Sequence, residues 1–139
     1  MVLDTYPLVI FFKNETGADD VQKILRKIEK GRIDAFISTL TISEIYYILA
    51  RYMNAEFATT VLKYIRINLK RTPVNDKIAE KGGQYKFQYV RTKGMPLADA
   101  IIAATALEEK AVLISGEKHF KKIEEIETKS PKEFLQSFR

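Results

Sequence analysis

The chain has 139 residues, 46% of them hydrophobic and 29% charged, a composition typical of one globular domain spanning residues 1–139. No segment approaches the roughly 20 consecutive apolar residues of a membrane span, which excludes a membrane-embedded protein. The absence of cysteine excludes disulfides and thiolate metal sites and favours a cytoplasmic protein. The apolar N-terminal run contains Asp4 and lacks a basic leader, so we expect it to belong to the fold.

The net charge of +5 is concentrated in one region of the chain. Between Thr60 and Lys93 the basic residues outnumber the acidic ones so strongly that this segment carries +7 and the remainder −2. A polyanion-binding surface has such a charge distribution, although solvated lysine-rich helix faces produce it too. The basic residues expected to guide a polyanion are Lys63, Arg66, Lys70, Arg71, Lys77, Lys81, Lys86, Arg91 and Lys93.

The first half of the chain alternates strand and helix patterns. The apolar residues 1–4 predict a strand, and residues 5–15 predict a helix. Residues 18–31 place their apolar side chains on one helix face. A strand over 33–39 then leads into a helix over 40–53, whose hydrophobic density predicts that it is mostly buried.

The middle of the chain continues this alternation. Residues 54–69 predict an amphipathic helix, and residues 70–74 a short strand. Residues 75–91 predict a weaker helix, interrupted by Gly82 and Gly83.

The last third begins with an Ile/Ala-rich helix over 97–110, followed by a continuous apolar strand over 111–115. A loop over 116–120 leads to an expected edge strand over 123–127. The chain ends in a short helix over 130–138, with a serine cap and proline at its first position.

The order of these elements predicts an α/β fold. Short apolar strands separated by helices indicate a mostly parallel sheet covered by helices on both faces, a three-layer sandwich. In such folds ligands bind beyond the carboxyl ends of the strands. Functional residues are therefore expected at that edge.

Four acidic residues fall at this edge of the predicted sheet. Asp4 follows the first strand, Glu117 follows the strand over 111–115, and Glu44 and Asp99 lie in the first turns of helices. Each also has a structural explanation: Asp4 as a cap, Glu44 in a T-x-x-E capping box with Thr41, Asp99 beside the positive end of a helix dipole, and Glu117 as a solvated loop residue.

Asp99 is the hardest of the four to explain structurally. It is the only charge in "PLADAIIAATA", and Ile102, Ala103 and Ala106 share its helix face. An acid in apolar surroundings must be neutralised, hydrogen-bonded or coordinated. Carboxylate oxygens without cysteine suit Mg²⁺ or Mn²⁺ better than zinc. Such an ion can activate water against a phosphodiester, a substrate that would also account for the positive region.

Four segments together resemble the PIN domain family, most of all the VapC-type toxin ribonucleases of VapBC toxin–antitoxin pairs. The most specific part is Asp99 at the start of an Ile/Ala-rich helix that leads into a hydrophobic strand and a Ser-x-acid-x-His-Phe loop. The resemblance extends from about residue 2 to residue 120. The segments are "LDT" at 3–5, "TISEIYY" at 41–47, "PLADAIIAATAL" at 96–107 and "LISGEKHF" at 113–120.

The resemblance implies a parallel five-stranded sheet and an endoribonuclease that depends on Mg²⁺ or Mn²⁺. It implies that Asp4, Glu44 and Asp99 form an acidic metal-binding triad, with Glu117 in the place of a fourth aspartate and Ser115 as a supporting hydroxyl. Glu117 is one methylene longer than aspartate, so it could bind a second metal through water or shift it. The resemblance also implies an RNA substrate, a homodimer, and an antitoxin whose C-terminal segment blocks the acidic site.

Three further residues need comment. Tyr6 and Gly116 replace residues that in this family are more often small polar or basic, so substrate contacts near them cannot be transferred. His119 is the only histidine and cannot build a zinc site, and a Ser-His-Asp triad lacks a nucleophile motif.

Two aromatic segments each allow two interpretations. Residues 84–91, "QYKFQYVR", interleave Tyr85, Phe87 and Tyr89 with basic residues, which could stack single-stranded bases or could be helix packing. Residues 44–65 contain more aromatic and aliphatic side chains than one core face needs. Their excess indicates either a dimer or partner surface or a thicker core.

Together these patterns predict a metal-dependent endoribonuclease that is the toxin of a toxin–antitoxin pair. One alternative is a PIN nuclease of RNA processing without an antitoxin. The other is a degenerate PIN-like module that binds RNA or protein without catalysis, which the glutamate at position 117 keeps open.

Overall fold

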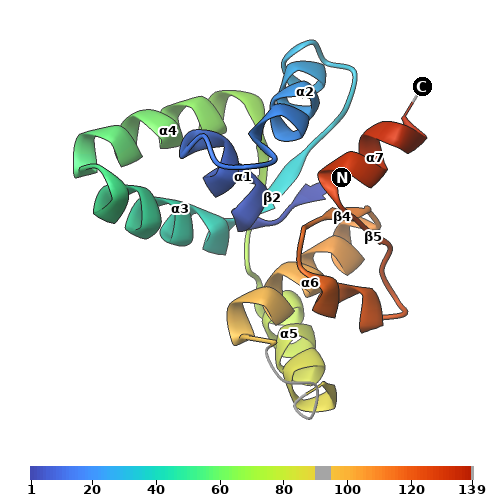
Figure 1. Ribbon diagram of the computed structural model, residues 1–139. Coiled ribbons are helices and arrows are strands. Elements are labelled where there is room, and N and C mark those ends of the chain that lie inside the picture. The colour runs from blue at the N-terminus through green and yellow to red at the C-terminus, as the bar shows by residue number, and fades with distance from the viewer. Residues whose placement is uncertain (90–94, 139) are drawn as a thin grey trace.

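The computed structural model describes residues 1–89 and 95–138, and its five strands there form one parallel sheet (Figure 1). The strands lie in the order β3-β2-β1-β4-β5, and every neighbouring pair is parallel. This confirms the predicted fold class. The strands are β1 (Val2–Leu3), β2 (Phe36–Ser38), β3 (Lys70–Thr72), β4 (Leu113–Ile114) and β5 (Thr128–Lys129).

Helices connect the strands in the described part of the chain. Within residues 1–89 and 95–138, none of them combines the length and apolar character that crossing a bilayer requires. The helices are α1 (Thr5–Phe12), α2 (Ala18–Glu29), α3 (Thr39–Tyr52), α4 (Ala55–Asn68), α5 (Asp76–Gln88), α6 (Leu97–Glu109), the 3₁₀ turn η1 (Lys118–Lys122) and α7 (Pro131–Ser137).

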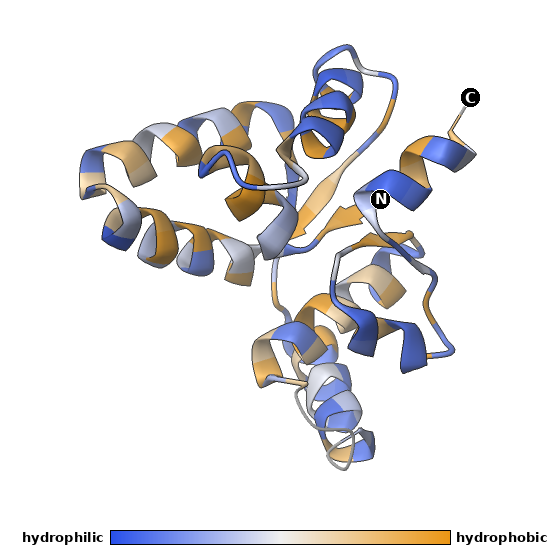
Figure 2. Ribbon diagram, viewed as in Figure 1, coloured by the Kyte–Doolittle hydropathy of each residue, from blue (hydrophilic) through white to orange (hydrophobic). Residues whose placement is uncertain are grey.

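The strands divide the core into two layers. Because neighbouring residues of a strand point to opposite faces, Leu3 and Ile114 join a cluster with α1 to α4, whereas Val2 and Leu113 join one with α5 and α6. In Figure 2 the central strands are orange, and polar residues lie on the outer faces of the helices. Helices therefore cover both faces of the sheet, which is the predicted three-layer sandwich.

The path of the chain creates a switch point between β1 and β4. From β1 the chain moves outward to β2 and β3, then returns to add β4 and β5 on the other side of β1. In open parallel sheets, the crevice beyond the carboxyl ends at such a reversal is the usual ligand site. The residues directly after β1 and β4 are Asp4 and Ser115.

Helix α5 runs unbroken through Gly82 and Gly83, so the predicted interruption is wrong. A Cβ built on Gly82 would lie 2.8 Å from Cγ1 and 3.1 Å from Cα of Ile101 on α6. The glycine lets the two helices approach closely, a tertiary reason that local propensity does not report. The last residues of the predicted helix, Val90 and Arg91, lie outside the described residues.

Two other boundaries also differ from expectation. The last strand is Thr128–Lys129 rather than 123–127, and the predicted loop over 116–120 contains most of the turn η1. Helix α3 is less buried than its hydrophobic density predicts, because its fully buried residues are only Thr41, Ile45 and Leu49. Its exposed large side chains include Tyr46, Tyr47 and Tyr52, which agrees with the surface interpretation of this segment.

Candidate active site

Asp4 and Ser115 bridge the carboxyl ends of β1 and β4. Asp4 is only 1% exposed and is the N-cap of α1, where its Oδ1 accepts a hydrogen bond from the Thr5 amide at 2.8 Å. Its Oδ2 accepts from the Ser115 hydroxyl, also at 2.8 Å. Ser115 Oγ in turn accepts from the amide of Glu117 at 3.0 Å. The side chain of Asp4 is thus both a helix cap and part of a polar network at the switch point.

Glu44 joins this network through Thr5. The Thr5 hydroxyl donates to Glu44 Oε1 at 2.6 Å, and the Thr41 hydroxyl lies 3.2 Å from the same threonine oxygen. Helix α3 begins at Thr39 and is capped by Ser38, whose Oγ accepts from the Leu40 amide. Because Thr41 is not the cap, the capping-box explanation of Glu44 is wrong.

Asp99 lies in the first turn of α6 and contacts His119. The Asp99 side chain is 20% exposed, and its Oδ2 lies 2.9 Å from Nε2 of His119. That nitrogen is not aligned for a hydrogen bond, so the pair is a close polar contact. The other ring nitrogen, Nδ1, lies 3.9 Å from Oε2 of Glu117. The imidazole therefore lies between the two carboxylates.

Burial and mutual repulsion raise the pKa of two of these acids. Burial is the largest cause for Asp4, whose pKa rises to about 7; the Ser115 hydrogen bond opposes the rise, while the charges of Asp99 and Glu44 add to it. For Asp99 burial again dominates, and the charges of Glu44 and Glu117 help to raise the pKa to about 6. Asp99 therefore interacts electrostatically with each of the other three predicted acids.

The donor set fits a hard divalent cation. Carboxylate and hydroxyl oxygens are the ligands that Mg²⁺ and Mn²⁺ prefer, and a cation would relieve the repulsion between the acids. No three histidine, aspartate or glutamate side chains in residues 1–89 and 95–138 already lie in a metal-holding arrangement. A preformed cage is not required for Mg²⁺, which usually keeps several waters and binds one or two carboxylates.

Comparison with protein-family models identifies the chain. The model of the PIN domain matches residues 1–126. The chain belongs to the PIN domain family. This is a family of nucleases, and its model covers every acid of the network, whereas α7 lies beyond it. No curated protein sequence is significantly similar to this chain.

Solved structures share the fold of this PIN domain over nearly its whole length. VapBC2 from Rickettsia felis, bound to a DNA fragment from its promoter, has a TM-score of 0.76 at 20% identity, covering 93% of this chain and 96% of that one. DNA-bound VapBC from Salmonella typhimurium has the same TM-score and identity, covering 94% and 96%. VapC20 from Mycobacterium tuberculosis, a sarcin-ricin loop cleaving toxin, has a TM-score of 0.72 at 12% identity, covering 88% and 94%.

Two side chains of the PIN domain site were not among the predicted site residues. Thr5 connects Asp4 and Glu44 through its amide and hydroxyl groups. It lies in the "LDT" segment, from which only the aspartate was predicted as a site residue. The sequence offers His119 no second ligand for zinc and no nucleophile motif for a Ser-His-Asp triad, so it does not predict a role for this residue. His119 lies two residues after Glu117, beyond the carboxyl end of the same strand, and this position could have indicated that it belongs to the acidic site.

The basic region of the PIN domain does not form one surface. Its described residues lie on α4, β3 and α5, and α4 and α5 pack on opposite faces of the sheet. Arg91 and Lys93 lie outside the described residues. Four of its lysines have partners within the chain: Lys70 with Asp34, Lys77 with Glu108, Lys81 with Glu125, and Lys86 with the Met95 carbonyl. The role of this region in guiding RNA stays a prediction.

The aromatic segment near the end of α5 is partly core. Tyr85 is fully buried and its ring lies 6.4 Å from that of Tyr89, which confirms the packing interpretation for this residue. Phe87 is 83% exposed. The segment therefore does not present a continuous row of aromatic rings.

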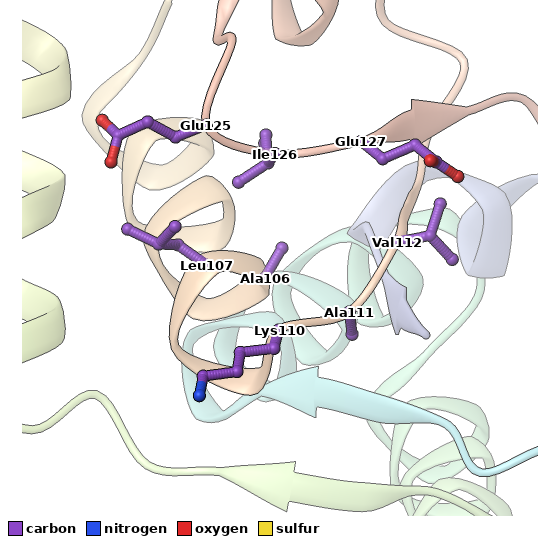
Figure 3. A pocket seen from close by; sticks show the side chains of 8 residues that line it. All are labelled: Ala106, Leu107, Lys110, Ala111, Val112, Glu125, Ile126 and Glu127. Carbon is purple, nitrogen blue, oxygen red and sulfur yellow. The ribbon is translucent and has the colours of Figure 1, made fainter.

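A hollow of about 360 Å³ lies at the opposite edge of the PIN domain sheet (Figure 3). Its lining includes Lys110 after α6, Val112 before β4 and Glu127 before β5. In Figure 3 the carboxylates of Glu125 and Glu127 point away from each other. Without convergent polar groups, this hollow offers no chemistry comparable to that of the carboxyl edge.

Proposed function

We propose that this PIN domain is a Mg²⁺- or Mn²⁺-dependent endoribonuclease. The observation that carries the proposal is the group of partly buried carboxylates at the β1/β4 switch point, where burial and repulsion raise the pKa of Asp4 and Asp99. Groups with strongly perturbed pKa values in such a position are typical of functional sites. Asp4, Glu44, Asp99 and Glu117 would hold the metal ion or ions.

The proposed reaction is hydrolysis of an RNA phosphodiester. The oxygen of water forms a bond to phosphorus, one P–O ester bond breaks, and a proton is taken up by the leaving oxygen. When bound, the divalent ion supplies a more acidic water and stabilises the charge that develops on the phosphoryl oxygens.

The residues of this chain prepare the site for that reaction. Thr5 orients Glu44 by donating a hydrogen bond to it, and Ser115 orients Asp4 in the same way. These hydroxyl groups fix the carboxylate oxygens before substrate arrives, which is the usual contribution of groups that support metal ligands.

We further propose that the protein is the toxin of a toxin–antitoxin pair, acts in the cytoplasm and forms a homodimer. Support comes from the VapBC complexes that share the fold and from large exposed side chains on and after α3, namely Tyr46, Tyr47, Tyr52 and Met53. Co-expression with the product of a small neighbouring gene should yield a stable complex that no longer cleaves RNA. A neighbour that neither binds nor inhibits the protein would favour a processing nuclease without antitoxin.

Asp99→Asn tests the catalytic proposal directly. The substitution keeps the size of the side chain but removes one carboxylate, so cleavage of single-stranded RNA in Mn²⁺ should fall by at least about 100-fold. Asp19→Asn on the exposed start of α2 is the matched control and should cleave at the wild-type rate. Equal rates for the two variants would contradict the site. Wild-type protein that binds RNA but never cleaves it, with either metal, would indicate a degenerate module.

A further inference from the structure

A second hollow, of about 270 Å³, opens beside the acidic site. Tyr6 and Pro7 at the start of α1, Ile10 one turn later and Val21 of α2 form its apolar wall. Gly116 and Glu117, directly after Ser115, form the part nearest the acids. The hollow is therefore continuous with the proposed catalytic site through Glu117 itself.

Tyr6 and Gly116 come from two different segments of the chain, and both line this hollow. Tyr6 follows Thr5, the residue that holds Glu44, and its side chain is 53% exposed. A Cβ built on Gly116 would meet no atom within 4 Å. Tyr6 thus supplies an aromatic ring to the lining of the hollow, and Gly116 adds no side chain to it.

We propose that this hollow, the base subsite, holds one unpaired nucleobase of the RNA substrate next to the scissile phosphate. The inference rests on the proposed function and adds to it the nucleotide position that the chain contacts. Proteins that bind single-stranded RNA stack its bases on aromatic side chains, and a half-exposed tyrosine beside an apolar wall offers such a surface. The volume lies below the roughly 300–1,000 Å³ of drug-sized sites, which suits one ring system.

The polar residues at the rim favour a nucleotide over an apolar side chain of a protein. Lys132 places a positive charge at one side of the base subsite, where an RNA phosphate next to the bound base would pair with it. Asp20, also at the rim, offers a carboxylate that can accept a hydrogen bond from the amino group of a base. A purely apolar guest would make use of neither charged group.

Abasic scanning tests the base subsite. A single-stranded RNA that the wild-type protein cleaves at one position is prepared with an abasic nucleotide at each position in turn. Removal of the base adjacent to the scissile bond should lower kcat/KM by about 10-fold or more, whereas removal of distant bases should have little effect.

Variants of the hollow locate that effect. Tyr6→Leu, which keeps an apolar side chain, and Gly116→Leu, which fills the open space, should both cleave the intact RNA about 10-fold more slowly and should abolish the penalty at the adjacent abasic position. Tyr6→Phe keeps the ring and should retain the penalty. Gly83→Leu places the same side chain into equally open space on α5 and should behave like the wild type. Thermal melting checks that each variant is folded.

The outcomes separate this inference from the proposed function. If the wild type cleaves RNA but Tyr6→Leu and Gly116→Leu show the wild-type pattern of abasic penalties, the base subsite is wrong while the nuclease proposal stands. If the wild type cleaves no RNA, a single-stranded RNA that it binds is scanned with abasic nucleotides instead. Fluorescence anisotropy in EDTA then measures the binding of each oligonucleotide to the wild type and to Tyr6→Leu. Binding that depends on one base and on Tyr6 would still support the subsite. Loss of binding to a protein partner in the hollow variants, without loss of RNA binding, would overturn it.

Discussion

The two edges of the sheet differ in which side chains they bury. Residues 1–89 and 95–138 contain seven buried polar side chains. Six of them lie at the carboxyl edge: at the end of a strand, directly after it, or in the first turn of the next helix. The seventh is Thr105 on α6. None lies at the opposite edge, where β1, β2 and β4 begin with Val2, Phe36 and Leu113. The six are Asp4, Thr5, Ser38, Thr41, Thr72 and Ser115.

This difference indicates that the carboxyl edge lowers the stability of the fold. A buried polar group costs free energy unless it is hydrogen-bonded, and a buried charge costs more. At the carboxyl edge the Thr5 amide and the Ser115 hydroxyl donate to Asp4, and the Thr5 hydroxyl donates to Glu44. The repulsion between the carboxylates remains in the metal-free protein. An edge selected only for stability would not bury carboxylates that repel one another. The predictions below test this contrast.

The largest effect is expected at Asp4. Asp4→Asn keeps an acceptor oxygen for the Thr5 amide but removes the buried charge, so cleavage should fall by at least about 100-fold. The same change should raise the melting temperature of the metal-free protein at pH 8, because less repulsion remains. A rate assay and a thermal melt on one preparation measure both effects.

Glu127→Gln is the matched control at the opposite edge. Glu127 precedes β5, its side chain is 66% exposed, and it pairs with Lys129 at 3.5 Å, so its loss should leave cleavage unchanged and alter stability by less than about 1 kcal/mol. If this variant lost activity as Asp4→Asn does, the contrast between the edges would be refuted.

A smaller effect is expected from the hydroxyl group that holds Glu44. Thr5→Val preserves the shape of the side chain but removes the 2.6 Å hydrogen bond, so cleavage should fall by about 10- to 100-fold. Thr5→Ser should restore most of the rate. Thr105→Val is the matched control. It removes a buried threonine hydroxyl that donates to the Ile101 carbonyl within α6, away from the acids, and should not change the cleavage rate. Equal rates for Thr5→Val and the wild type would show that Glu44 needs no support.

The stability of the metal-free protein should fall as the pH rises. The folded-state pKa values of Asp4 and Asp99, about 7 and about 6, lie above the ordinary value of 3.8. Between these values the folded state binds more protons than the unfolded state, so this stabilisation is complete below about pH 4 and is lost as the pH rises through 6 and 7. In EDTA the melting temperature should therefore decrease from pH 5 to pH 8.

Divalent metal and Asp4→Asn both test this pH dependence. Mn²⁺ binds the deprotonated acids, so it should raise the melting temperature more at pH 8 than at pH 5. The Asp4→Asn variant should lose part of the decrease seen in EDTA. A wild-type melting temperature that is constant or rises over this range in EDTA would contradict the pKa directions.

Much of this site could be predicted from the sequence because strand ends are marked by short apolar runs. Asp4 and Ser115 directly follow such runs, and parallel strands bring their carboxyl ends to one edge. The contact of His119 with Asp99 could not be predicted in the same way. It depends on the conformation of the turn η1, which carries the imidazole back to the first turn of α6.

The two wrong predictions about the helices also concern contacts between elements that lie far apart in the sequence. The burial of α3 was overestimated because composition does not say how many neighbours a helix has, and Tyr46 and Tyr47 face outward. The interruption at Gly82 was inferred from the low helix propensity of glycine. Contact with Ile101 outweighs that propensity, and only the packed structure reveals the contact.

The two glycines of α5 provide the smallest prediction, a change in stability without a change in activity. Gly82→Ala should destabilise the protein by about 1–3 kcal/mol, because its Cβ would press on the Ile101 backbone as well as its side chain. Gly83→Ala meets no atom within 4 Å and should stabilise the helix by up to about 1 kcal/mol. Denaturant unfolding measures both changes, and RNA cleavage below the melting transition should be the same for the two variants. If the cleavage rate instead decreased in Gly82→Ala and increased in Gly83→Ala, the position of the acids would depend on the packing of α5 and not on their own hydrogen bonds. That result would contradict the contrast between the two edges.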